Sequence, residues 1–217
     1  ENTVVGNAAG VAVTTGADNT LLGDNAGGAI TTASGHTAVG SSALLTITTG
    51  TTGTAVGFEA LKLATGDNNT AVGYQAGKTV STGTENTLIG TAAGDAVSTG
   101  ADNTFLGSSS GGTLSTGSNN VAIGSAALFA ATTSSEHTAV GASALFTITT
   151  GTTGTAVGFE ALKVATGNHN TAVGHQSGLA VSTGTRTTIV GGAAGNAVTT
   201  GDDNTLLGYN AGGSIST

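Results

Sequence analysis

The sequence predicts an all-β protein: a parallel β-solenoid (β-roll) of about thirteen coils of 16–17 residues, with two short strands in each coil. Three observations support this fold class. A short motif recurs along the whole chain at a nearly fixed period, bulky and charged residues are rare, and glycines separate the recurring segments. Because each coil of a solenoid contacts only its neighbours, we expect a thin core that runs along one axis.

The recurring motif reads Asn-Thr-Ala-Val-Gly at residues 69–73. Successive copies lie 17 residues apart, except for two that lie 16 apart. The glycine that ends each copy stands at 6, 23, 40, 57, 73, 90, 107, 124, 141, 158, 174, 191 and 208. A repeat of this length indicates a stack of small structural units and not a set of globular domains.

The composition excludes several classes of protein. Aromatic residues are 3% and charged residues 7% of the chain, so a wide globular core cannot be filled, whereas a thin one can. The formal net charge is −8 with only 4 Lys and Arg, which argues against nucleic acid and anionic membranes as partners. No apolar run approaches the length of a membrane helix, so we expect no membrane contact by this segment.

The first extended segment of each coil is the motif itself, and both of its faces are apolar. The residue before the glycine is Val, Ile or Leu in every copy, as at Val5 and Leu22, and we expect this column to be buried. The preceding residue is also apolar, as at Leu21 and Phe105. Since strand side chains alternate between two faces and a solenoid has one interior, the second face is predicted to be covered by another copy of the chain.

Asparagine opens the motif in most coils, and we expect these side chains to form an amide ladder at a corner. Its positions are Asn2, Asn19, Asn69, Asn86, Asn103, Asn120, Asn170 and Asn204. His36 and His137 replace it in two coils, where an imidazole can donate a hydrogen bond as Asn does. An alternative is that threefold symmetry brings three such histidines together around a metal. We prefer corner packing, and we predict no metal, cofactor or catalytic residue.

The second extended segment has the form apolar-x-Thr-Gly, as at Val13–Gly16 and Ile47–Gly50. It is predicted to be a half-exposed strand whose closing glycine has a positive φ. Strand alternation would place Thr15 on the same face as Val13, and Thr32 on the same face as Ile30. We therefore expect these threonines to point inward.

A longer period overlies the short one. Residues 36–77 match residues 137–178 at 35 of 42 positions, an offset of 101 residues or six coils. We interpret this as a duplicated six-coil block present in about two copies. Residues 1–217 are accordingly predicted to be a single repetitive segment, a fragment of a longer fibre.

The motifs that suggest catalysis are better explained by the repeat. Gly107–Gly111 matches the nucleophile-elbow pattern Gly-x-Ser-x-Gly, but its glycines belong to the repeat and no helical pattern follows. Glu59 with Lys62, and Glu160 with Lys163, are interpreted as solvated ion pairs on a turn. We predict that the protein is not an enzyme.

Two stretches resemble known repeats. Residues 119–124, Asn-Asn-Val-Ala-Ile-Gly, resemble the head repeat of trimeric autotransporter adhesins, and residues 69–77, Asn-Thr-Ala-Val-Gly-Tyr-Gln-Ala-Gly, are similar to repeats of phage tail fibres. The resemblance covers all thirteen units. It implies a parallel β-roll in which three chains stand side by side, with the Val-Ala-Ile strand towards the threefold axis, and a role in surface attachment. The units here have a longer connection between strands than the adhesin repeat.

Three functions are compatible with this pattern. The first is the shaft or head of a fibre that is extracellular, at a cell surface or on a virion. Its partners would be copies of itself and a host-surface receptor bound through parts outside this segment. The second is an ice-binding or other surface-binding solenoid that uses threonine columns, and the inward orientation expected for Thr15 and Thr32 counts against it. The third is a monomeric solenoid that polymerises end to end.

Overall fold

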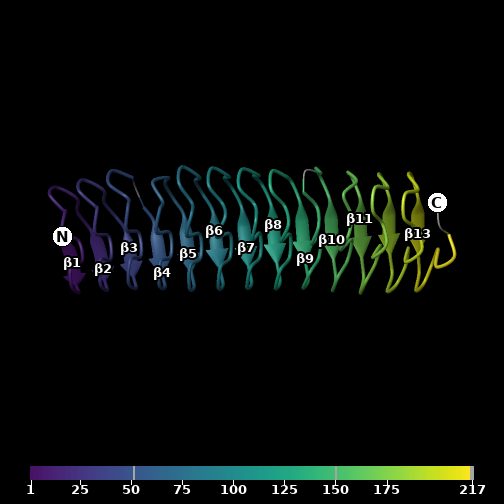
Figure 1. Ribbon diagram of the computed structural model, residues 1–217, viewed down its shortest axis with the longest axis horizontal. Helices are drawn as coiled ribbons and strands as arrows, with labels where there is room; N and C mark the ends of the chain where they lie inside the picture. The colour runs from purple at the N-terminus through teal and green to yellow at the C-terminus, as the bar shows by residue number, and fades with distance from the viewer. Residues whose placement is uncertain (51, 150, 216–217) are drawn as a thin grey trace.

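The computed structural model describes residues 1–50, 52–149 and 151–215 and shows a single parallel β-solenoid. Thirteen strands lie side by side in sequence order and form one sheet along the long axis, with the two chain ends at opposite ends of the stack (Figure 1). Each strand pairs with the equivalent residues of the next coil, as in Thr104 with Val121. The predicted solenoid is confirmed.

The strands are three or four residues long. They are β1 (Asn2–Val5), β2 (Asn19–Leu22), β3 (Thr37–Val39), β4 (Thr54–Val56), β5 (Thr70–Val72), β6 (Thr87–Ile89), β7 (Thr104–Leu106), β8 (Val121–Ile123), β9 (Thr138–Val140), β10 (Thr155–Val157), β11 (Thr171–Val173), β12 (Thr188–Val190) and β13 (Thr205–Leu207).

The side chain two residues before the strand-ending glycine points into the coil. Leu21, Leu88 and Phe105 are fully buried there. The residue directly before the glycine faces outward, so its predicted burial is wrong for the single chain: Leu22 and Leu106 are each 45% exposed. Alternation along the strand lets only one of two neighbouring apolar residues reach the interior.

The second segment of the coil is not a strand in the described residues, contrary to the prediction of two strands per coil. Its backbone does bond to the next coil, as where Ser98 N donates to Ser115 O at 2.9 Å. The chain bends there, and the isolated bridge between Ser135 and Thr152 lies just after this segment, before the asparagine corner. Each coil therefore contributes one strand to the sheet and one bent segment to the opposite wall.

The glycines that follow the second segment are needed for close stacking and not for a positive φ. Gly100 and Gly117 are absent from the residues with positive φ, which corrects the prediction. A Cβ on Gly100 would lie 2.3 Å from the carbonyl oxygen of Gly117, and one on Gly117 would lie 1.9 Å from the carbonyl oxygen of Ser134. At these two positions the coils are too close for an ordinary side chain, whereas Ala33 and Ser134 show that other coils admit a small side chain in the same column.

The core is filled by two positions in each coil that vary together. Where the strand contributes a large residue, the turn six residues later has glycine: a Cβ on Gly111 would lie 2.3 Å from the ring of Phe105. Where the strand contributes alanine, as at Ala122, the turn has a buried leucine, Leu128. Each pair thus supplies about one large side chain per coil, which suits an interior of constant cross-section.

The coils of β5 and β11 depart from this rule because both positions are small, Ala71 with Gly77 and Ala172 with Gly178. Neighbouring coils fill the space, since a Cβ on Gly77 would lie 2.6 Å from Leu88 and 2.9 Å from Leu61. The interior is packed between coils as well as within them.

We expect Phe105→Ala to lower the free energy of unfolding by about 3–5 kcal/mol, because it leaves a cavity at a fully buried position. Gly111→Leu should also destabilise, because the leucine meets the Phe105 ring. The double variant F105A/G111L should recover most of both losses, since it recreates the pair Ala122 and Leu128. Guanidinium unfolding measures all three, with exposed Phe159→Ala as the control. Losses that simply add in the double variant would contradict complementary packing.

Candidate interaction surfaces

The described part of the chain forms no pocket and contains no group of three or more His, Cys, Asp and Glu placed to hold a metal ion. Within the same residues, no helix is long and apolar enough to cross a membrane. Candidate functional features must therefore be sought among the corners, faces and edges that run along the solenoid axis.

The asparagine corner forms the predicted amide ladder. Asn103 Nδ2 donates to Asn86 Oδ1 and to Gly117 O, both at 3.0 Å. Asn103 Oδ1 accepts hydrogen bonds from Asn120 N at 3.1 Å and Asn120 Nδ2 at 3.0 Å. These three asparagines are fully buried and their bonds run between coils, so the corner is a packing feature and not a ligand site.

The two corner histidines make the same two bonds as asparagine. His137 Nδ1 accepts from Gly154 N at 2.9 Å, and its Nε2 lies 2.8 Å from Gly151 O. Because a carbonyl accepts and an N–H donates, the ring is neutral with its proton on Nε2. His36 has the equivalent partners one block earlier. Both rings are buried, and both nitrogens of each ring are hydrogen-bonded within the chain, which confirms corner packing. Neither ring has a nitrogen available to a metal ion shared between chains.

Burial lowers the pKa of His137 below its usual value. Protonation would also place a hydrogen on Nδ1, where Gly154 N already donates. The neutral ring is therefore the form that fits the folded coil.

The outward side of the sheet, here called the sheet face, carries two continuous columns. One is threonine in every strand except β8, which has Val121, and the other is aliphatic in every strand. Val72 is 37%, Ile89 36% and Leu106 45% exposed. The aliphatic column is formed by Val5, Leu22, Val39, Val56, Val72, Ile89, Leu106, Ile123, Val140, Val157, Val173, Val190 and Leu207. No segment of the described chain covers this face.

The threonines of the second segment point outward, contrary to prediction. Thr32 and Thr116 are exposed, although Ile30 and Leu114, two residues before them, are fully buried. Alternation fails here because the segment bends and is not a strand. The described members of this threonine rank are Thr15, Thr32, Thr49, Thr82, Thr99, Thr116, Thr133, Thr183 and Thr200, all exposed.

The rank is interrupted in the two 16-residue coils. Thr65 Oγ1 donates to Ser81 O at 2.9 Å, as Ser81 Oγ does to Ser98 O. Thr65 is therefore equivalent to Ser81, which stands one residue before a member of the threonine rank. The residue that this 16-residue coil lacks is the rank threonine itself. Thr166 makes the corresponding bond in the second block.

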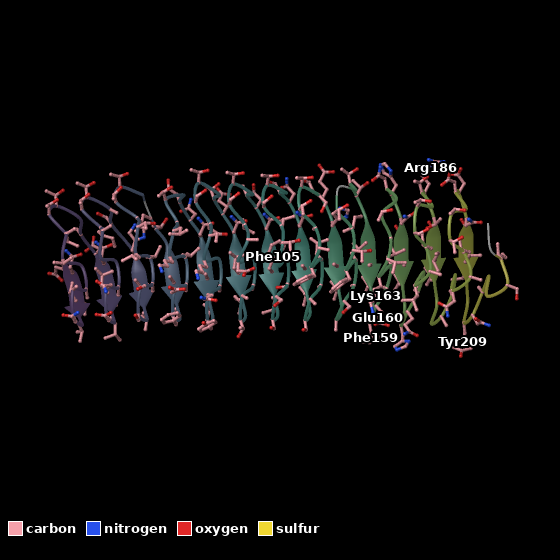
Figure 2. The ribbon with its side chains drawn as sticks, viewed as in Figure 1. Phe105, Phe159, Glu160, Lys163, Arg186 and Tyr209 are labelled. Carbon is pink, nitrogen blue, oxygen red and sulfur yellow. The ribbon has the colours of Figure 1, made fainter. Side chains whose placement is uncertain are left out.

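Two exposed pairs of rings lie in the turns that follow the strands. Phe58 stacks on Tyr74 with ring centroids 5.4 Å apart and planes 11° apart. Phe159 stacks on His175 with values of 5.3 Å and 20°. Figure 2 places Phe159, Glu160 and Lys163 together on the lower edge of the stack.

The predicted solvated ion pair at Glu59 is a half-buried network. Glu59 Oε1 accepts from Lys62 at 2.6 Å, and Oε2 lies 2.9 Å from Lys78 Nζ and 2.8 Å from Gln75 Nε2. Hydrogen bonds from Lys62, Lys78 and Gln75 lower the pKa of Glu59 to about 2. The carboxylate of Glu59 therefore stays ionised at pH values at which an ordinary glutamate is already protonated.

Glu160 repeats most of this arrangement. It accepts from Lys163 at 2.6 Å and from Gln176 at 2.8 Å. These bonds lower its pKa, and Leu179 stands where the first block has Lys78.

The serine at the centre of Gly107–Gly111 belongs to the repeat. Ser109 has a positive φ of 55°, which an elbow would require, but Ala126 has the same φ one coil later. The conformation is a general property of this turn and does not single out a nucleophile.

Comparison of this chain with family models, with curated proteins and with solved structures found no match.

We expect the stability of the fold to fall with acidification below about pH 6.5, in part through His137. Its pKa is lower in the folded chain, so the unfolded chain binds more protons in this range. The loss is at most about 1.4 kcal/mol per pH unit, ends once the folded pKa is passed, and disappears above the unfolded pKa. Unfolding by denaturant between pH 8 and 5.5 measures it.

His137→Asn should remove this contribution and keep the fold, because asparagine makes the same bonds in the other coils. The control is exposed His169→Asn, which installs the residue that Asn68 already supplies one block earlier. An unchanged acid dependence in H137N, or the same reduction in H169N, would contradict the assignment.

Proposed function

We propose that this chain is a structural segment of an extracellular fibre, in which copies of the chain cover one another's sheet face. The observation that carries the proposal is the unbroken column of outward-facing aliphatic side chains on thirteen strands, each of which is exposed or half-buried in the single chain. At about 4.8 Å per strand the column is about 60 Å long. Apolar patches of such length are unusual on soluble monomers and mark interaction surfaces.

A second copy is the occupant that the pattern favours. The column keeps the same spacing from coil to coil, so an identical column matches it along its entire length, and a rotational symmetry axis brings identical surfaces together. The resemblance of the motif to adhesin and tail-fibre repeats favours three chains around such an axis. Location at a cell surface, on a virion or free outside cells follows from the same proposal, with any receptor bound through other parts of the molecule.

The mechanical role follows from the bonding pattern. Hydrogen bonds between coils run parallel to the long axis, as from Gly107 N to Ile89 O at 2.8 Å and Gly90 N to Val72 O at 2.8 Å. The turns between coils are short and tied to their neighbours by the same kind of bond. Such a rod resists shear and presents few flexible loops to proteases.

Sedimentation velocity tests the proposal. The wild-type chain of 20.3 kDa should sediment as a trimer, and L22E/L106E should shift it towards the monomer, because it places like charges in the apolar interface. The matched control T99E/T183E adds the same charge to the threonine rank and should leave the mass unchanged. A wild-type chain that stays monomeric over a wide concentration range would overturn the proposal.

Ice binding is a second candidate because of one observation: the threonine rank is exposed while the aliphatic residues beneath it are buried. The hydroxyls of the preceding residues donate to the next coil, as Ser98 Oγ does to Ser115 O at 3.1 Å, which fixes the backbone under the rank. A rigid row of hydroxyl and methyl groups at coil spacing is suited to holding ordered water.

Measurement of thermal hysteresis tests this candidate directly. An ice-binding rank predicts a gap between melting and freezing points at micromolar protein, abolished by Thr99→Lys with Thr116→Lys. The sheet-face variant L22E/L106E should retain the gap. Freezing and melting points that coincide in the wild type would remove ice binding from consideration.

A further inference from the structure

Two groups of side chains on the lower edge of the solenoid are not explained by the repeat. The first, here called patch 1, comprises Phe58, Glu59, Lys62, Tyr74, Gln75 and Lys78. The second, patch 2, comprises Phe159, Glu160, Lys163, His175, Gln176 and Leu179. Figure 2 shows the side chains of Phe159, Glu160 and Lys163 projecting from this edge.

The stacking of coils does not demand these residues. At the position of the first ring, the flanking coils carry Ser41 and Thr91, and the turn closes with the same backbone bond there, from Ala43 N to Gly40 O and from Ala93 N to Gly90 O, as from Ala60 N to Gly57 O. Each patch spans one of the two 16-residue coils, Gly57 to Gly73 or Gly158 to Gly174. Departures from a repeat that stacking does not require are where a binding role is expected.

Each patch offers flat aromatic surface. Phe58 is 44%, Tyr74 53% and Phe159 46% exposed, although each is already stacked on a neighbour. The ring of Tyr74 is followed along the column by the small Thr91, and that of His175 by Gly192. The ring pairs thus end on coils that have no side chain large enough to cover them.

The polar groups beside the rings carry no uncompensated negative charge. Both oxygens of Glu59 are held by Lys62, Lys78 and Gln75, and both oxygens of Glu160 by Lys163 and Gln176. Each ammonium group has three donors, of which the carboxylate takes one. The patches therefore present fixed donors next to apolar ring surface, on an edge that has no pocket.

We propose that patches 1 and 2 are binding sites for a neutral polysaccharide. A sugar ring has C–H bonds on its faces and hydroxyl groups around its rim. The faces can pack on Phe58 and Tyr74 while the rim accepts hydrogen bonds from the lysine and glutamine side chains. A shallow open edge suits an extended polymer, because a small molecule would need a concave site to bury its surface.

The spacing of the patches supports a polymeric ligand. They lie six coils apart, about 29 Å at about 4.8 Å per coil. Two weak contacts on one rigid edge act together on a single long chain, and the gain in affinity is lost if the ligand is too short to span both. The inference does not depend on the fibre proposal, because the edge is separate from the sheet face.

Affinity electrophoresis in native gels tests it, with dextran, yeast mannan, galactomannan and xyloglucan dissolved in separate gels. Mobility is expressed relative to a gel without polysaccharide. The wild-type chain should be retarded by at least one of these polymers, in high salt as in low. The variant F58S/Y74T/F159S/H175T should lose this retardation. It installs at patch 1 the residues of the flanking coils, Ser41 and Thr91, and it makes the same two replacements at patch 2.

Two controls separate the possible results. Equal unfolding free energy of wild type and quadruple variant shows that the loss is not misfolding, and L22E/L106E, which disrupts only the sheet face, should be retarded as wild type. Absence of retardation in all four polymers, or equal retardation of the quadruple variant, overturns the proposal. A fifth gel contains dextran sulfate, and retardation in this gel alone that vanishes in high salt also overturns the proposal, because it would show ionic recognition by lysines.

Discussion

The hydrogen bonds between each coil and the next, always in a register of one coil, determine the rest of this structure. They place every residue beside its equivalent, so that a side chain that fits in one coil is repeated as a column. Asn86, Asn103 and Asn120 show the consequence at the corner, where each amide satisfies the next and closes off polar groups that would otherwise be buried without partners. His137 is accommodated in the same column because its two ring nitrogens reproduce the acceptor and donor of asparagine.

Much of this architecture could be predicted from the sequence, because periodicity is a property of the backbone register. The solenoid, the motif strand and the asparagine ladder all follow from it. The side of the strand that faces the interior does not follow from periodicity. Leu21 and Leu22 are equally apolar, so their residue types alone do not reveal which of the two side chains is buried. A signal was nevertheless present, since the column of Leu21 and Phe105 alternates with alanine in step with the Gly or Leu six residues later. Such compensation in size is expected only of residues that share an interior.

The second segment differs from the sequence prediction because its backbone bends. Strand alternation holds only for extended residues, so Thr32 lies on the opposite side from Ile30 and not beside it. The edge patches were missed for a different reason, as Glu59 and Lys62 were recognised only as an ion pair. Their partners Gln75 and Lys78 come from the next coil, and only the stacked geometry brings them to one carboxylate. The two 16-residue steps are the sequence signal that could locate the patches, because each patch spans one of these coils.

A solenoid of this kind separates its surfaces, so the sheet face, the threonine rank and the lower edge can serve different partners without disturbing one core.

The strand is divided into an inner column of buried side chains and an outer column of solvent-facing side chains, and the rest of the account depends on this division. Relaxation of assigned leucine methyl signals by a soluble paramagnetic agent tests it most directly. Leu21 and Leu88 should be shielded at every protein concentration, whereas Leu22 and Leu106 should be shielded only where the chain self-associates and should relax strongly on dilution. Relaxation of Leu88 as strong as that of Leu106 in dilute solution would contradict the account.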